Sequence, residues 1–329
     1  MNSLVSRTAD ASAQASAAAP ADAALPTVAV VMTVHDGLPY VVAAVDSILA
    51  QTFKAFEFII VDDGSTDGTS DYLDAIGDPR VKVVHQTQQG QQAAAHCGIQ
   101  KATAPLIARM DSDDVSHSER LERQVHFLNA NPEVGLVGSQ ITRRGEVGSG
   151  LRSHFPTDHE QITDDLLHNR HSMCNPSTMF RRDLYFQVGG YWPHNIAEDW
   201  DLFLKIAEVA KLANLAEPLL SYRFHSGSIN GRRIVDAQLY NEFAAHQAGL
   251  RRQGLPADTF AEFLAQHRSQ RLPHSLFFYA DCHSVAQYRK AVAEMHSGRP
   301  IVGRLRGMYA ILCSPGRMLR RVRNYLTWP

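Results

Sequence analysis

Short apolar runs alternate with segments of helical periodicity along the first half of the chain. The first run, Val28 to Val34, is continuous and mostly β-branched, and Pro26 and Gly37 bound it. A short run without polar alternation is typical of a strand buried on both faces of a sheet. Three comparable runs follow, with helical segments between them: Phe56 to Val61, Val81 to Val84 and Leu106 to Met110. The alternation predicts an α/β fold, with a parallel sheet covered by helices.

The spacing of apolar residues predicts the remaining elements. Helices are expected after Pro39, after Thr66-Asp67, and over Gly90 to Ala102, Ser118 to Ala130, Asp158 to His168 and Asp199 to Ala210. Further strands are expected over Val134 to Ile141, Ser177 to Phe180 and Leu219 to Phe224. From Asn230 onward the pattern is helical and basic, which predicts a helical C-terminal extension.

Composition narrows the class of protein. The chain has 329 residues, 44% of them hydrophobic, so a sizeable core can form, and the net charge of −2 gives no reason to expect nucleic acid as a partner. Four cysteines lie far apart without a CxxC pair, which argues against a zinc knuckle and against structural disulfides. A reducing, cytoplasmic location fits this usage, and no apolar run reaches the length of a membrane span.

The two ends of the chain differ in composition from the middle. Residues 1–26 are rich in Ala and Ser and lack a basic segment followed by an apolar one, so we expect a disordered leader rather than a signal peptide. Residues 231–329 form the predicted extension, and no acidic residue follows Arg299. Its arginines are interleaved with apolar residues. Two readings stay open: peripheral contact with an anionic membrane surface on the cytoplasmic face, or a solvated tail packed on the domain.

Carboxylates crowd the end of the fourth predicted strand, in Asp111-Ser112-Asp113-Asp114. Like charges a few Å apart repel unless a proton or a cation intervenes. In extended backbone, Asp111 and Asp113 point to the same side. Such a pair suits a hard cation, Mn²⁺ or Mg²⁺, that also binds phosphate oxygens. The alternative is a turn that caps the following helix.

A second acidic cluster, Asp62-Asp63-Gly64, follows the second predicted strand. One carboxylate can accept from a ligand N–H such as the imide of uracil, while the other stabilises the loop. Ligands of open α/β sheets bind at the carboxyl ends of strands, where both acidic clusters are expected. The alternative is an Asx-turn that leads into a helix.

Two further candidates lie toward the end of the sheet. Glu198-Asp199 precedes an apolar helix, where it can supply a general base or be an acidic first turn favoured by the helix dipole. His225 follows the last predicted strand and can offer a nitrogen to a metal, although the chain has 16 histidines and a surface role is the simpler alternative.

Taken in order, these segments resemble the family 2 glycosyltransferases of the GT-A fold. The resemblance rests on Val28 to Thr33, Ser47 to Phe53, Asp62 to Asp67, Asp111 to Asp114, Ala197 to Leu202 and Tyr222 to Ile229. It covers roughly residues 27–230, which we predict to be the GT-A glycosyltransferase domain. The resemblance implies a mixed, mostly parallel sheet with helices on both faces.

The resemblance implies a hexosyltransferase-type enzyme (EC 2.4) that inverts the anomeric centre. The donor would be a nucleoside-diphosphate sugar, with a UDP-sugar favoured, and a divalent cation would be required. The acceptor would be the hydroxyl of a saccharide or of a lipid-linked acceptor, in cell-surface polysaccharide or glycolipid synthesis.

The family's roles carry over to matching positions of this sequence. Thr33 and Asp63 match nucleoside-contacting positions, and Asp111 matches the acid near the ribose. Asp113 matches the metal-binding acid with Asp114 beside it, and His225 matches the metal-binding histidine. Asp199 matches the catalytic base, and Glu198 matches a position that contacts the acceptor or donor sugar.

The chain departs from the family pattern at two places. His35-Asp36 stands where Tyr-Asn is common, and Ala94-Ala95-His96 replaces an Ala-Arg-Asn triplet. Two other functions are alternatives. A nucleotidyltransferase should carry a Gly-rich basic loop after the first strand, and Thr33 to Leu38 has no basic Lys or Arg. A non-catalytic GT-A-like binding subunit is conceivable from the altered triplet, but the acidic residues and His225 argue against it.

Overall fold

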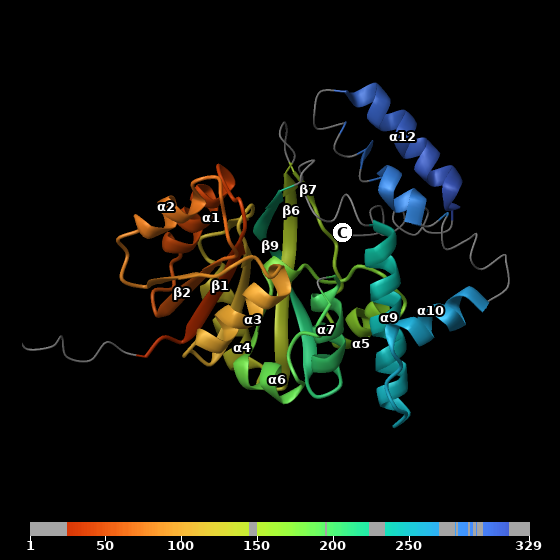
Figure 1. The fold of residues 1–329 in the computed structure, drawn as a ribbon, viewed down its shortest axis with the longest axis horizontal. Coiled ribbons are helices and arrows are strands. Elements are labelled where there is room, and N and C mark those ends of the chain that lie inside the picture. Colours follow the sequence, from red (N-terminus) through yellow and green to blue (C-terminus); the bar gives the residue numbers. More distant parts are fainter. Residues whose placement is uncertain are drawn as a thin grey trace, which may run out of the picture.

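A single curled sheet organises the molecule. The computed structural model describes residues 25–144, 150–194, 196–223, 234–269, 280, 282–288, 290–291, 294 and 299–315. In this part of the chain the sheet has nine strands in the order β3-β2-β1-β4-β8-β6-β9-β5, with β7 paired to β6 (Figure 1). The predicted leader, residues 1–24, lies outside the described residues.

The elements follow one another in a strand–helix alternation over the first half. The bounds there are β1 Val28–Val34, α1 Tyr40–Leu49, β2 Phe56–Asp62, α2 Thr69–Asp74, β3 Val81–His85, α3 Gln91–Lys101 and β4 Leu106–Asp111. The second half continues with β5 Val115–Ser116, α4 Arg120–Ala130, β6 Val134–Arg144, β7 Leu151–Arg152, α5 His159–Leu167, the 3₁₀ turn Asn175–Ser177, β8 Met179–Arg181, α6 Arg182–Gln187, α7 Glu198–Ala207 and β9 Lys211–Arg223. The C-terminal helices are α9 Ile234–Arg252, α10 Phe260–Ser269 and α12 Pro300–Cys313.

The parallel half of the sheet confirms the strands expected from the apolar runs. β1 pairs in parallel with β2 and β4, and β2 with β3. Every residue of β1 and of β2 is buried, as continuous apolar runs require. The register sets Thr33 opposite Asp111 and Val34 opposite Asp62, so the polar residues at three strand ends meet at one edge.

The other half mixes directions. β8 runs antiparallel to both β4 and β6, while β9 runs parallel to β6. The last strand was expected from Leu219, but β9 already begins at Lys211. The early part of β9 was not predicted from the sequence because Pro218 interrupts it. The register with β6 shifts between Ser139 and Gln140, and this shift accommodates Pro218 in the strand. Proline is tolerated in sheets at such irregularities.

Helices cover both faces of the sheet, as predicted. Alternate residues of β1 enter two different clusters: Ala29 and Val31 in one, Val28 and Val30 in the other. The first cluster contains the apolar sides of α3, α5, α7 and α9, and the second those of α1 and α4. The helical extension is therefore confirmed, with α9 sharing the core of the sheet. A domain boundary near residue 230 stays a prediction, because residues 224–233 lie outside the described part.

None of the described helices combines the length and the apolar character that crossing a bilayer requires.

Candidate active site

The carboxyl edge of the parallel strands gathers the predicted site residues. Thr33, near the end of β1, is 8% exposed and lies beside Asp111, the last residue of β4. Asp62 ends β2 on the other side, and Asp63 donates its backbone N–H to the carbonyl oxygen of Val34 at 2.8 Å. One edge of the sheet thus brings together residues from three neighbouring strands.

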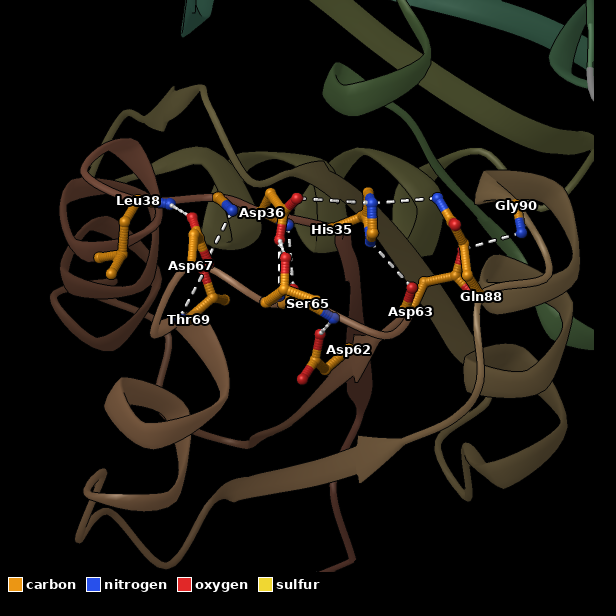
Figure 2. A network of polar contacts seen from close by, with 12 residues as sticks. His35, Asp36, Leu38, Asp62, Asp63, Ser65, Asp67, Thr69, Gln88 and Gly90 are labelled. Carbon is orange, nitrogen blue, oxygen red and sulfur yellow. Dashed lines mark hydrogen bonds and ion pairs between the residues drawn. The ribbon is translucent and has the colours of Figure 1, made fainter.

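The Asp63 carboxylate organises the loop that leads into α3. Its Oδ1 accepts from Gln86 Nε2 at 2.7 Å and from the backbone N–H of Gln89 at 2.8 Å. Its Oδ2 accepts from the backbone N–H of Gly90 at 2.8 Å. Figure 2 shows Asp63 facing this loop. A loop-holding role is therefore visible, and contact with a nucleoside stays a prediction for Asp63 and for Thr33.

Asp62 holds its own loop, as the Asx-turn alternative predicted. Its Oδ1 accepts from the backbone N–H of Ser65 at 3.0 Å, and its Oδ2 lies 2.5 Å from Ser70 Oγ and 3.0 Å from His85 Nδ1. These hydrogen bonds outweigh the cost of burial, which by itself raises the pKa, and the pKa of Asp62 is lowered overall. Asp62 is thus a charged scaffold for the acidic loop.

His35, one of the departures from the family pattern, bridges two loops. Its Nδ1 lies 3.0 Å from the carbonyl oxygen of Asp63 and its Nε2 lies 3.0 Å from Gln88 Nε2 (Figure 2). A carbonyl only accepts, so Nδ1 carries the proton and Nε2 accepts from the Gln88 amide. Gly64 completes the arrangement: its φ is +79°, and a Cβ there would lie 2.9 Å from the backbone nitrogen of Gln88.

Three carboxyls after β4 form the acidic centre of the site. Oxygen atoms of Asp111, Asp113 and Asp114 lie within 4.8 Å of one another. Asp114 is only 1% exposed. In the described part of the chain, Asp111 Oδ1 and Asp114 Oδ2 are buried without a hydrogen-bond partner. Buried carboxylate oxygens without donors are costly, so this arrangement favours a cation or a shared proton.

The crowding raises the affinity of the cluster for protons. Burial, together with the charge of Asp113, raises the pKa of Asp111 to about 7. Burial and the charges of Asp111 and Asp113 raise the pKa of Asp114 well above its ordinary value. The cluster is therefore short of positive charge near neutral pH, which is the condition under which a divalent cation binds most favourably.

Two buried arginines lie against the acidic centre, and neither was recognised as part of it from the sequence. Arg109, inside β4, is 1% exposed and donates from Nη1 to the carbonyl oxygen of Val31 at 2.7 Å. Arg120, at the start of α4, is fully buried and donates from Nη1 to the carbonyl oxygens of Arg109 and Pro176. Burial lowers the pKa of Arg120 to about 10, against the opposing charges of Asp114 and Asp111.

The arginine in a buried strand had a sequence signature. Arg109 interrupts an otherwise apolar run, and a buried guanidinium requires a nearby carboxylate. Arg120 had none, because an arginine in the first turn of a helix is ordinarily exposed. Together the two arginines offset part of the acidic charge and leave the rest for a ligand.

Asp114 also connects the acidic centre to the end of β9. Its Oδ1 accepts from the backbone N–H of Arg223 at 2.9 Å, and Arg223 Nε donates to the carbonyl oxygen of Asp113 at 2.9 Å. The chain therefore leaves β9 beside the acidic cluster. His225, two residues further on, lies outside the described residues, so its predicted metal role stays a prediction.

The N-terminus of α7 adds the last two carboxyls. Ala197 precedes the helix with a φ of +54°, and Asp199 Oδ1 accepts from the backbone N–H of Trp200 at 2.9 Å. Burial raises the pKa of Asp199, and burial together with Asp199 raises the pKa of Glu198 to about 8. The charge of Asp199 also raises the pKa of Asp111, so the two acidic groups share one electrostatic environment.

The donor set fits a divalent cation. Clustered carboxylate oxygens are the ligands that Mg²⁺ and Mn²⁺ prefer, and two of these oxygens are buried without a protein donor in the described structure. The two buried arginines do not keep Asp111, Asp114 and Glu198 ionised against burial, since the pKa of each carboxyl is raised, so a cation can take the place of their protons.

Comparison with known proteins gives consistent matches. A model of glycosyl transferase family 2 matches residues 29–189. The O-antigen biosynthesis glycosyltransferase WbnJ of Escherichia coli is 32% identical over 247 residues, which cover 72% of this chain and 92% of WbnJ. The amylovoran biosynthesis glycosyltransferase AmsE of Erwinia amylovora is 30% identical over 221 residues, covering 62% and 80% of the two chains.

Solved structures share the fold at low identity. TarS residues 1–349 of S. aureus, in complex with UDP-GlcNAc, superimposes with a TM-score of 0.58 at 18% identity, covering 86% of this chain and 89% of that one. The mannosyltransferase PcManGT of Pyrobaculum calidifontis, in complex with GDP-Man and Mn²⁺, gives a TM-score of 0.51 at 17% identity, covering 87% and 88%.

Proposed function

This chain belongs to the family 2 glycosyltransferases, and from that premise we propose that it is an inverting, metal-dependent enzyme that uses a nucleoside-diphosphate sugar. Membership makes it a transferase with the GT-A fold. The proposal concerns the finer features: the stereochemistry, the cation, the donor and the acceptor.

The observation that carries the proposal is the convergence of the acidic groups. Asp111, Asp113 and Asp114 lie within 4.8 Å of one another, and the charge of Asp199 acts on Asp111. This much negative charge repels a diphosphate, so donor binding requires a counter-charge. Asp111, Asp113 and the predicted ligand His225 would hold Mn²⁺ or Mg²⁺. When bound, the cation supplies Lewis-acid stabilisation for the charge on the leaving diphosphate.

The base of the reaction is Asp199. Its raised pKa, caused by burial, makes the carboxylate a better proton acceptor than an ordinary aspartate. The acceptor hydroxyl gives its proton to Asp199 while its oxygen bonds to the anomeric carbon, and the bond from that carbon to the diphosphate oxygen breaks. Attack from the face opposite the leaving group inverts the anomeric centre.

Glu198 has a complementary role in this scheme. Its pKa of about 8 leaves it mostly protonated at neutral pH, so it can donate a hydrogen bond to a sugar oxygen. Two adjacent carboxyls with different protonation states can thus serve as donor and as base. In this proposal Thr33 and Asp63 hold the nucleoside, and Asp111 lies near the ribose. The positions of these three residues at the ends of neighbouring strands support the roles.

The relatives support the choice of substrates. WbnJ and AmsE are named for O-antigen and amylovoran biosynthesis, which supports a saccharide or lipid-linked acceptor in cell-surface polysaccharide synthesis. TarS in complex with UDP-GlcNAc and PcManGT in complex with GDP-Man and Mn²⁺ support a nucleotide-sugar donor and a divalent cation. A UDP-sugar is the donor we favour.

A donor screen tests the proposal. Purified protein is incubated with a panel of UDP- and GDP-sugars, with Mn²⁺ or with EDTA, and release of the nucleoside diphosphate is measured. We expect one nucleotide class to be turned over in Mn²⁺ only, with Asp113→Ala inactive and Asp46→Ala, at an exposed acid on α1, fully active. NMR of the product should show the inverted anomer.

Two outcomes would replace the proposal. Release of pyrophosphate from a nucleoside triphosphate and a sugar phosphate would indicate a nucleotidyltransferase. Metal-dependent binding of a donor, without turnover across a range of acceptors or water, would indicate a non-catalytic binding subunit.

A further inference from the structure

Helix α12 buries small residues and exposes large apolar ones, which is the reverse of an ordinary surface helix. Its buried residues are small: Gly303 and Ala310 face inward, and Ser284 Oγ donates to the carbonyl oxygen of Ala310 at 2.7 Å. A Cβ on Gly307 would lie 4.0 Å from Ala291 Cβ, on the same packed side. The helix therefore packs through small side chains on the segment that contains Ser284 and Ala291. It lies at the edge of the molecule, at the upper right of Figure 1.

The outward face of α12 carries the large apolar side chains. Ile301, Leu305, Met308 and Leu312 are 72%, 62%, 62% and 77% exposed. Their spacing of four, three and four residues places them in one stripe along the helix. Val302 and Tyr309, at 44% and 50% exposed, widen it on one side. A continuous exposed apolar stripe marks an interaction surface, whereas single exposed residues such as Val209 need no explanation.

The charge around this stripe has one sign. Arg304 is exposed beside it, whereas Arg306 is held on the packed side by Glu294, with Nε and Oε2 2.8 Å apart. From residue 299 to the C-terminus the sequence contains seven arginines and no Asp, Glu or Lys, although the net charge of the whole chain is −2. An apolar face next to arginines complements a surface that is apolar within and negatively charged at its boundary.

We propose that α12 docks this chain on an anionic lipid surface, with the stripe of Ile301, Leu305, Met308 and Leu312 among the acyl chains and Arg304 at the headgroups. A second copy of the chain fits less well, because pairing two such helices would bring arginines together with no acidic residue from 299 onward to neutralise them. The inference is independent of the transfer chemistry, since α12 contributes no residue to the acidic site.

Co-sedimentation with vesicles tests the docking. The full-length protein is mixed with phosphatidylserine/phosphatidylcholine vesicles and with pure phosphatidylcholine vesicles at 0.1 M salt. We expect pelleting with the anionic vesicles that weakens in pure phosphatidylcholine and at 0.5 M salt. The double variant Leu305→Gln/Leu312→Gln should bind at least tenfold more weakly. Arg304→Gln should bind about fivefold more weakly.

A matched control separates this surface from general stickiness. Val209→Gln/Leu255→Gln removes two other exposed apolar residues, 48% and 49% exposed and far from α12 in the sequence, and should pellet like the wild type. Donor turnover with a soluble acceptor and the thermal midpoint should match the wild type in every variant, which shows that each is folded. Arg304→Gln keeps the stripe intact, so it tests the proposal even if the double variant unfolds.

Three results would overturn the proposal. The wild type stays in the supernatant with anionic vesicles. The double variant and Arg304→Gln both pellet as the wild type does. Light scattering shows a dimer that the double variant dissociates while vesicle binding is absent; that result would assign the stripe to a second copy of the chain.

Discussion

Replacing Asp111 by asparagine should stabilise the metal-free protein while removing function. An unfolded aspartate titrates near 3.8, whereas burial and Asp113 raise the pKa of Asp111 to about 7 in the folded protein. Between these values the folded state keeps a proton that the unfolded state releases. Stability therefore falls as pH rises from about 4 to about 7, and the full cost is present above pH 7.

The size of the effect follows from the shift. About three pKa units correspond to about 4 kcal/mol at pH 8, an upper bound because nearby carboxyls and arginines share the charge. Asp111→Asn removes this cost and loses little, since Asp111 Oδ1 has no hydrogen-bond partner in the described structure. At pH 5 the gain in the free energy of unfolding of Asp111→Asn over the wild type should drop below about 2 kcal/mol.

Thermal unfolding in EDTA at pH 5 and pH 8 measures the difference. A chain of this size moves its midpoint by about 2 °C per kcal/mol, so Asp111→Asn should gain up to about 8 °C at pH 8 and much less at pH 5. Adding Mn²⁺ should stabilise the wild type and not the variant. Asp46→Asn, at an exposed position, serves as the control. A variant that is destabilised equally at both pH values would refute the reasoning.

Three further predictions concern single side chains. Asp199→Asn should keep donor affinity, measured by calorimetry, while transfer falls about 10²- to 10⁴-fold; equal losses of both would indicate a structural cap. Gly64→Ala should cost about 1–3 kcal/mol by urea unfolding, because φ is +79° and the new Cβ meets Gln88, whereas Gly77→Ala, in open space, should cost much less. Arg120→Met should cost about 3–5 kcal/mol by the same assay, since it removes one of the two buried counter-charges of the acidic centre; a loss below about 1 kcal/mol would contradict that role.

The sheet edge could be predicted because parallel strands end together. Largely apolar runs identified β1, β2 and β4, and the polar residues after them had to meet at one edge. The first part of β9, before Leu219, could not be predicted, because Pro218 and polar residues interrupt it and only the pairing with β6 accommodates them.

The acidic residues of the site could be predicted from the sequence, but the residues that pack against them could not. Asp111 and Asp113 stand out in the sequence, whereas Arg120 reaches the carbonyl of Pro176, 56 residues away, and nothing local indicates that contact. The interleaved apolar and basic pattern of the C-terminal segment left its packing open. Which side of α12 is buried depends on the small residues Gly303 and Ala310 finding a neighbour.

Direct binding of Mn²⁺ tests the central claim that the acidic cluster exists to hold a cation with a nucleotide. Electron paramagnetic resonance can count free Mn²⁺ during titration of the wild type and of Asp113→Ala, with and without UDP. We expect one bound ion per wild-type chain, bound more tightly when UDP is present, and none in the variant at the same concentrations. Equal Mn²⁺ binding by both proteins, or no binding by either, would contradict it.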